Sequence, residues 1–160
     1  MRKKNTGGIF LLALLGAAIT TFCDGVHIHT RTLAYTHPFW FGQPWWVYPN
    51  FVLAFLLMGY GYLFLVDRLP AMIETRKSTS QGNARELIET LITFALVYLL
   101  SGFGNFEPIC LSIIFYGTFA VRLIFSYDRS WLLLLAFLMA VGGMFAEGVF
   151  AAAGMMKYRC

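Results

Sequence analysis

The sequence has few charged residues. Asp, Glu, Lys and Arg make up 12% of its 160 residues, whereas hydrophobic residues make up 59%. An average soluble domain carries about 25% charged residues, and the mean hydropathy of this chain is +0.67. These values are not those of a soluble fold, and we expect one integral membrane domain over residues 1–160.

Cysteines and catalytic motifs are equally scarce. Cys23, Cys110 and Cys160 lack the paired spacing of a disulfide framework or a zinc site. The sequence also contains no nucleophile motif, phosphate-binding loop or paired-cysteine site. We therefore expect that the protein is not an enzyme and that it uses no cofactor.

The net charge of +4 does not indicate nucleic-acid binding, because most basic residues lie in predicted tails and connections. If the N-terminus lies inside the cell, these residues also lie inside, and only Arg31, Lys157 and Arg159 lie outside. Basic residues favour the cytoplasmic side of a membrane protein. The pattern therefore predicts a cytoplasmic N-terminus.

Long apolar runs take the place of charge. About 20 apolar residues in a helix cross the hydrocarbon core of a bilayer. Five runs approach this length, at residues of about 9–26, 46–66, 85–104, 108–127 and 131–155. We predict an all-α, polytopic bundle of five transmembrane helices.

The first run has two interpretations. Arg2-Lys3-Lys4 followed by an apolar segment is typical of a signal peptide, with Gly16-Ala17-Ala18 as a cleavage region. The alternative is an uncleaved first span. We favour the span, because the apolar run continues through Phe22 and the acid that follows it has a counterpart near the far end.

That counterpart belongs to a repeated pattern. Asp24-Gly25-Val26 returns as Glu147-Gly148-Val149, and Tyr158 follows Glu147 at the offset at which Tyr35 follows Asp24. An internal repeat would make the five spans part of a six-span plan. The alternative is chance similarity within an apolar sequence of low complexity.

Ionisable residues within spans are expensive and are therefore functional candidates. Asp24 and Glu147 should share a depth near the outer side, close to His27 and His29. They could be protonated or capped acids in the bundle, they could hold the polar head of a lipid, or they could form a metal or proton site with the histidines. His27, His29 and His37 lack the i, i+4 spacing of a strong metal motif, so we expect no metal.

Two further groups of residues lie within predicted spans. Gly142 and Ala146 share one face of the last span, where small side chains let a neighbouring helix or a flat ligand pack closely. Glu89 and Arg122 lie at similar depths from the inner side and have opposite charges. We expect the second pair to form a structural ion pair.

Four short motifs lie in order between Trp45 and Gly148: Trp45-Trp46-Val47-Tyr48-Pro49, Asp67-Arg68, Ile109-Cys110-Leu111-Ser112 and Tyr127-Asp128-Arg129-Ser130. They resemble motifs of the Insig (insulin-induced gene) family of membrane proteins, which are Trp-Trp-Val/Ile-Pro-Pro at the entry to the second span, Asp-Arg, Ile-Gln-Leu-Ser and Phe-Asp-Arg-Ser. The first motif has one extra residue here. The order and spacing of these landmarks agree to within a few residues.

The resemblance implies a six-helix fold that holds a sterol-like or diacylglycerol-like lipid. It also implies that Asp128, with Arg129, belongs to an inner loop used for partner regulation. The alternative for Asp128 is a helix cap, because negative charge is favoured at a helix N-terminus.

Two departures separate the chain from the animal members of that family. The sixth span is absent, so another subunit of a homo-oligomer could supply its wall, and the histidine-rich outer loop does not match. We therefore expect a bacterial relative in an inner membrane rather than in the endoplasmic reticulum.

The favoured function is lipid binding within the bundle, with possible regulation of a membrane partner. The alternative is a small membrane enzyme or carrier that uses Asp24, Glu147 and the histidines for proton or metal chemistry.

Overall fold

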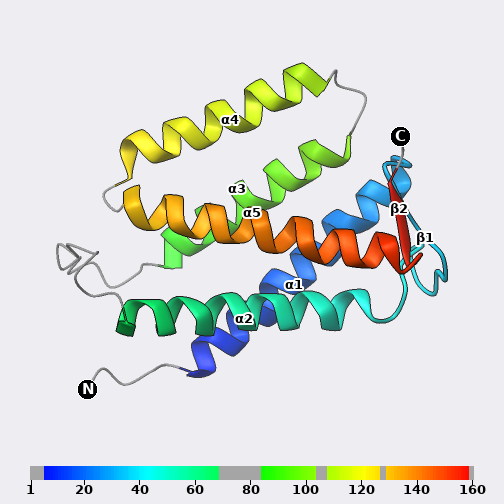
Figure 1. The fold of residues 1–160 in the computed structure, drawn as a ribbon, viewed down its shortest axis with the longest axis horizontal. Coiled ribbons are helices and arrows are strands. Elements are labelled where there is room, and N and C mark those ends of the chain that lie inside the picture. Colours follow the sequence, from blue (N-terminus) through cyan, green and yellow to red (C-terminus); the bar gives the residue numbers. More distant parts are fainter. Residues whose placement is uncertain (1–5, 69–83, 104–107, 127–128, 159–160) are drawn as a thin grey trace.

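A computed structural model describes residues 6–68, 84–103, 108–126 and 129–158 (Figure 1). It contains five helices and two short strands in these ranges, which confirms the predicted all-α bundle. The helices are α1 (Thr6–His29), α2 (Val47–Arg68), α3 (Ala84–Gly102), α4 (Pro108–Phe125) and α5 (Arg129–Ala152), and the strands are β1 (Leu33–Tyr35) and β2 (Met156–Tyr158).

The helix bounds differ from the predicted spans by a few residues at several ends. α1 continues through His29, about one turn beyond the predicted end, and α5 ends at Ala152 instead of Met155. In both cases the helix ends at a short turn that leads into the following strand.

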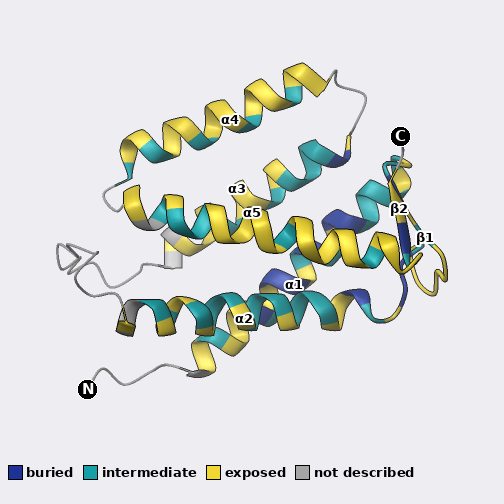
Figure 2. Cartoon of the chain, in the orientation of Figure 1, coloured by how far each residue is buried: buried dark blue, intermediate teal, exposed yellow. Residues whose placement is uncertain are grey.

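α1 provides half of the buried hydrophobic residues in the described ranges, and these side chains are small. Ala13, Ala17 and Cys23 are at most 1% exposed. Small residues let the neighbouring helices approach closely, and a Cβ added at Gly16 would lie 3.0 Å from the ring of Phe55 on α2. Gly59 of α2 approaches Ile9 of α1 in the same way, whereas Gly61 meets no neighbour within 4 Å. The buried residues of Figure 2 accordingly gather along α1 and at the strands.

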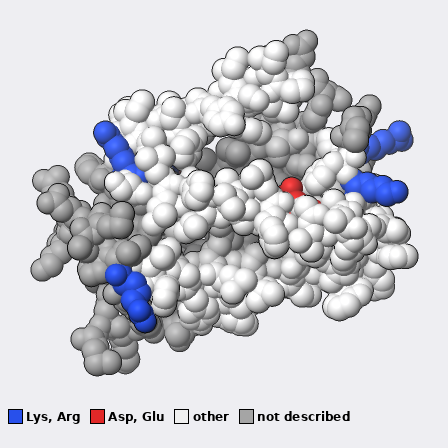
Figure 3. Space-filling model, in the orientation of Figure 1, with Lys and Arg blue, Asp and Glu red and all other residues white. Residues whose placement is uncertain are grey.

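α4 and α5 are covered much less than α1. No residue of α4 is buried, and α5 is mostly exposed in Figure 2. The chain exposes 12426 Å², whereas a folded soluble monomer of 18.1 kDa exposes about 8,100 Å². On the face shown in Figure 3, Lys and Arg lie toward the two ends of the molecule, with an almost uncharged band between them. This surface suits surroundings of lipid rather than water.

The two strands pair antiparallel with a symmetric register. Leu33 lies opposite Tyr158, Ala34 opposite Lys157 and Tyr35 opposite Met156. If residues 123 positions apart are counterparts (35 and 158), the first pair maps onto the third and the middle pair maps onto itself. The ladder therefore has a local two-fold axis that relates the two copies of the pattern. The strands themselves were not predicted.

The ends of α1 and α5 show the same correspondence between residues 123 positions apart. Arg31 and Gly154, which are counterparts, both adopt positive φ, at 59° and 70°. Three backbone hydrogen bonds after α1 recur after α5 in the same register. After α1 they run from Thr30 N to Val26 O (2.9 Å), from Arg31 N to Ile28 O (3.0 Å) and from Thr32 N to His27 O (2.9 Å). After α5 they run from Ala153 N to Val149 O (2.9 Å), from Gly154 N to Ala151 O (3.0 Å) and from Met155 N to Phe150 O (3.0 Å). The two segments thus share one backbone conformation.

The ladder also constrains the number of membrane crossings. Four helices are long and apolar enough to cross, and α3, whose apolar part is Leu87–Gly102, is shorter. Paired strands lie on one side of a membrane, so the chain between them crosses an even number of times. If α2, α4 and α5 all cross, they give three crossings, and an even number then requires a fourth crossing by α3. Its 19 residues span about 28 Å, close to the thickness of the hydrocarbon core.

Candidate functional site

A buried carboxylate lies where α1 meets the ladder. Asp24 is 3% exposed and accepts hydrogen bonds from three side chains on separate segments. The hydroxyl of Tyr35 on β1 donates to Oδ2 (2.9 Å), Gln43 Nε2 donates to the same oxygen (3.3 Å), and the Tyr98 hydroxyl on α3 donates to Oδ1 (3.4 Å). A buried charged group needs such partners to offset the loss of water.

The counterpart, Glu147 on α5, lies in a more open environment. Its side chain is exposed and forms a hydrogen bond with the hydroxyl of Tyr158 on β2. The pair reproduces Asp24 and Tyr35, at the same offset of eleven residues (24 to 35 and 147 to 158). Tyr98 lies within electrostatic range of both carboxylates, so both pairs lie at one end of the bundle.

Both tyrosine hydroxyls stay protonated and act as donors. Burial, and then the neighbouring Asp24 carboxylate, raises the pKa of Tyr35 above its usual value of 10.0. Burial and the hydrogen-bonded Glu147 carboxylate raise the pKa of Tyr158 from the same value. Ionising either phenol beside a carboxylate would place two negative charges together in a partly dehydrated site.

The histidines do not form a cluster around the carboxylates, although His27 lies within electrostatic range of Asp24. His27 lies between Cys23 O (2.9 Å from Nδ1) and Ser101 Oγ (3.0 Å from Nε2) and joins α1 to α3. His29 and His37 are exposed. Within the ranges that the structure describes, no group of three or more His, Cys, Asp and Glu residues could hold a metal ion.

The other predicted site residues are dispersed. A Cβ at Gly142 would meet nothing within 4 Å, and Ala146 is exposed, so no described helix packs on this face of α5. The expected pairing of Glu89 with Arg122 is wrong. Glu89 Oε1 instead accepts a hydrogen bond from Arg85 Nε at 2.8 Å, because the i, i+4 spacing on one helix brings these side chains together.

Arg129 begins α5 and donates from Nη2 to Ile124 O at 2.8 Å, which satisfies a carbonyl at the end of α4. Its predicted companion in a partner loop or cap, Asp128, lies outside the described residues.

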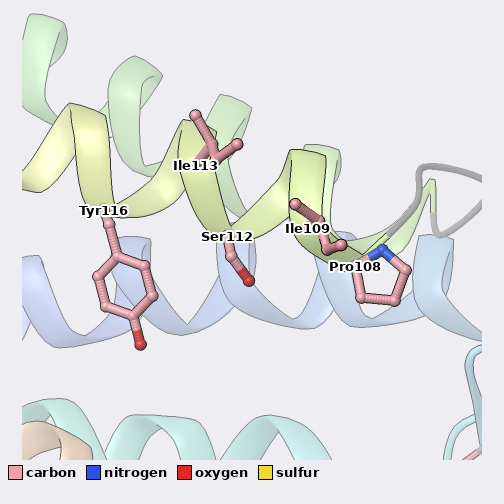
Figure 4. A pocket seen from close by; sticks show the side chains of 5 residues that line it. All are labelled: Pro108, Ile109, Ser112, Ile113 and Tyr116. Carbon is pink, nitrogen blue, oxygen red and sulfur yellow. The ribbon is translucent and has the colours of Figure 1, made fainter.

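Two pockets accompany these residues. The smaller, of about 380 Å³, is a groove along α4 lined by Pro108, Ile109, Ser112, Ile113 and Tyr116. Figure 4 shows Ser112 and Tyr116 pointing to the same side of that helix. The larger, of about 740 Å³, lies between α1 and the connection to α2. It shares Gln43 with the Asp24 site, and sequence reasoning missed both its existence and the role of Gln43.

No family model, no curated protein and no solved structure matches the chain.

Proposed function

We propose that the protein holds an amphipathic membrane lipid within its helical bundle, with a hydroxyl of the lipid head group at Glu147. The observation that carries the proposal is the difference between the two equivalent carboxylates. Asp24 is buried and accepts hydrogen bonds from three side chains. Glu147 is exposed, and among the described residues its side-chain donor is Tyr158.

Glu147 lies within a helix that can span the membrane, where a carboxylate needs hydrogen-bond donors. Glu147 lies in a membrane-compatible helical segment, Leu132–Ala152, five residues before its end. An acidic group inside a bilayer costs a few kcal/mol and needs a partner. A lipid hydroxyl can donate to the carboxylate just as Gln43 and Tyr98 donate to Asp24.

The surface beside Glu147 suits the apolar part of such a lipid. Gly143 lies one turn before Glu147, and a Cβ at Gly142 or Gly143 would meet no atom of the described residues within 4 Å. Ala146 adds another small side chain. A flat or extended hydrocarbon can therefore pack against the backbone of α5, where larger side chains would hold it away.

The resemblance to the Insig family agrees with this proposal, because sterol-like and diacylglycerol-like lipids each carry a hydroxyl. The same proposal places the protein in a bacterial inner membrane with a cytoplasmic N-terminus. A second subunit could cover the open face of α5, and the α4–α5 connection at Arg129 could transmit lipid binding to a membrane partner.

Native mass spectrometry of the full chain in a mild detergent tests the proposal. We expect the wild-type protein to retain one lipid per chain and E147L to lose it. The control is E89Q, which removes a carboxylate near the other end of the bundle and should leave the lipid bound. A bare wild-type protein, or E147L with full lipid retention, contradicts the proposal. E147Q keeps an acceptor oxygen and should keep the lipid, whereas proton chemistry at Glu147 would be lost.

A further inference from the structure

We propose a second binding site, independent of the lipid at Glu147, for a neutral, planar ring molecule with one carbonyl or hydroxyl group. The site is the pocket of about 740 Å³ between α1 and the connection to α2. Thr21, Gly25 and His29 line it from α1, and residues 39–41, 43–45 and Tyr48 line it from the other side. Its volume lies in the range of pockets that bind small organic ligands.

The polar anchor of this site is the hydroxyl of Thr21. Its Oγ1 is buried and has no hydrogen-bond partner among the residues that the structure describes. The neighbouring Thr20 Oγ1 donates to Gly16 O at 2.8 Å, which is the usual solution for a threonine within a helix. Buried hydroxyls are nearly always paired. A ligand carbonyl or hydroxyl in the pocket would give Thr21 the partner that the described part of the chain does not supply.

Gln43 cannot donate to a ligand carbonyl, because both hydrogens of its amide nitrogen are already used. Gln43 Nε2 donates to Thr21 O at 2.7 Å and to Asp24 Oδ2 at 3.3 Å. The amide thereby fixes the connection against α1 beside the Thr21 hydroxyl. The pocket wall is thus held in place by the Asp24 network, beside the buried Thr21 hydroxyl.

Exposed aromatic rings surround the mouth of the pocket. Phe39, Trp40, Phe41 and Trp45 line it and are 68–80% exposed. Planar ligands stack on such rings with favourable offset or edge-to-face geometry. An aromatic belt at the membrane interface accounts for exposed tryptophans in general, but it does not account for the backbone that presents Phe41.

Phe41 adopts a φ of 48° and Gly42 a φ of 74°. They form a tight turn closed by hydrogen bonds between Trp40 and Gln43, with N–O distances of 3.0 and 2.8 Å. Positive φ is rare for a bulky residue, and such strain is concentrated at functional sites. The turn holds the Phe41 ring at the pocket mouth, although phenylalanine adopts a positive φ only with a steric cost.

The charge of the lining sets the charge of the ligand. The lining contains no Asp, Glu, Lys or Arg, and its polar side chains are those of Thr21, His29, Gln43 and Tyr48. A phosphate or ammonium group would therefore lose its hydration here without an opposite charge to replace it. The ligand class that fits is neutral, with an apolar ring body and one hydrogen-bonding group.

A benzoquinone with a ten-carbon tail is a suitable probe, because its carbonyl can accept a hydrogen bond from Thr21. We would titrate it into the full chain in mild detergent and measure the dissociation constant. T21V should weaken binding about 3- to 10-fold, the equivalent of one hydrogen bond. T20V is the matched control and should leave the dissociation constant unchanged.

Thermal unfolding of the ligand-free variants separates binding from folding. T21V should unfold no earlier than the wild-type protein, because its hydroxyl has no partner to lose, whereas T20V should unfold earlier. A18F should fill the pocket and abolish probe binding, and E147L should bind the probe normally. Equal affinity of T21V and wild-type protein, no saturable binding of the quinone, or equally tight binding of a monoacylglycerol would each overturn the proposal.

Discussion

At the scale of single residues, the two carboxylate–tyrosine pairs show how the same chemistry acquires different surroundings. Tyr35 and Tyr158 both donate to an acid eleven residues earlier, but Asp24 is 3% exposed and Glu147 is exposed. The donors added by Gln43 and Tyr98 turn the first pair into a closed structural network. The second pair has room for a ligand.

Tyr35 should make the free energy of unfolding fall at high pH. Its pKa is raised in the folded protein by burial and by Asp24, so the unfolded chain releases the phenolic proton first, near pH 10. The unfolded state then binds fewer protons, and the free energy of unfolding falls as the pH rises above 10, by up to about 1.4 kcal/mol per pH unit. Chemical denaturation in detergent at pH 8, 10 and 11 measures this slope.

Y35F is the control for that slope. It should be less stable than the wild-type protein at pH 8, by about 1–3 kcal/mol, because buried Asp24 loses a donor. Its stability should then fall less steeply above pH 10. Parallel curves for the two proteins would show that Tyr35 does not titrate differently on unfolding.

Sequence reasoning named Asp24 and Glu147 as candidate site residues, and the repeated pattern also marked Tyr35 and Tyr158. Asp24, Glu147, Tyr35 and Tyr158 recur at fixed offsets. Gln43 and Tyr98 carry no such mark, because each is a single polar residue whose partner lies 19 or 74 positions away. The Glu89–Arg122 pairing failed for a related reason, because depth along a helix does not determine which neighbour a long side chain reaches.

At the scale of elements, the turn after each helix explains why the copies share one conformation. Counterparts Arg31 and Gly154 both have positive φ, which reverses the chain at a helix C-terminus and is favourable for glycine. Helix positions were predictable from apolar length. The three-residue strands were not, because they are too short to show an alternating pattern and depend on pairing between segments far apart in the sequence.

The shared turn predicts opposite effects of two substitutions. R31G should stabilise the protein by up to about 1 kcal/mol, because glycine adopts positive φ without the steric cost of a side chain. G154A should destabilise it by about 1 kcal/mol for the converse reason. Thermal or chemical unfolding in detergent measures both. Stabilisation by G154A, or clear destabilisation by R31G, would contradict a common left-handed turn.

At the scale of the whole molecule, the ladder joins the first and last helices and thereby determines how the chain crosses the membrane. α1 packs closely against α2 through Gly16 and Gly59, whereas α4 has no buried residue. The link between α5 and the rest depends on β1–β2 and on the Trp46 and Phe150 rings, which stack with centroids 5.2 Å apart. The ladder end is therefore the part of the structure on which both proposed binding sites depend.

A cysteine pair at the centre of the ladder tests this arrangement. Ala34 and Lys157 lie directly opposite each other, and antiparallel partners are about 4.5–5.5 Å apart between Cα atoms, within reach of a disulfide. In a chain with Cys110 and Cys160 replaced by serine, we expect A34C/K157C to form an intramolecular disulfide under mild oxidation. Each single variant should react with a membrane-impermeant thiol reagent from the same side of the membrane. Labelling from opposite sides would mean that α3 does not cross the bilayer and that the strands cannot pair there.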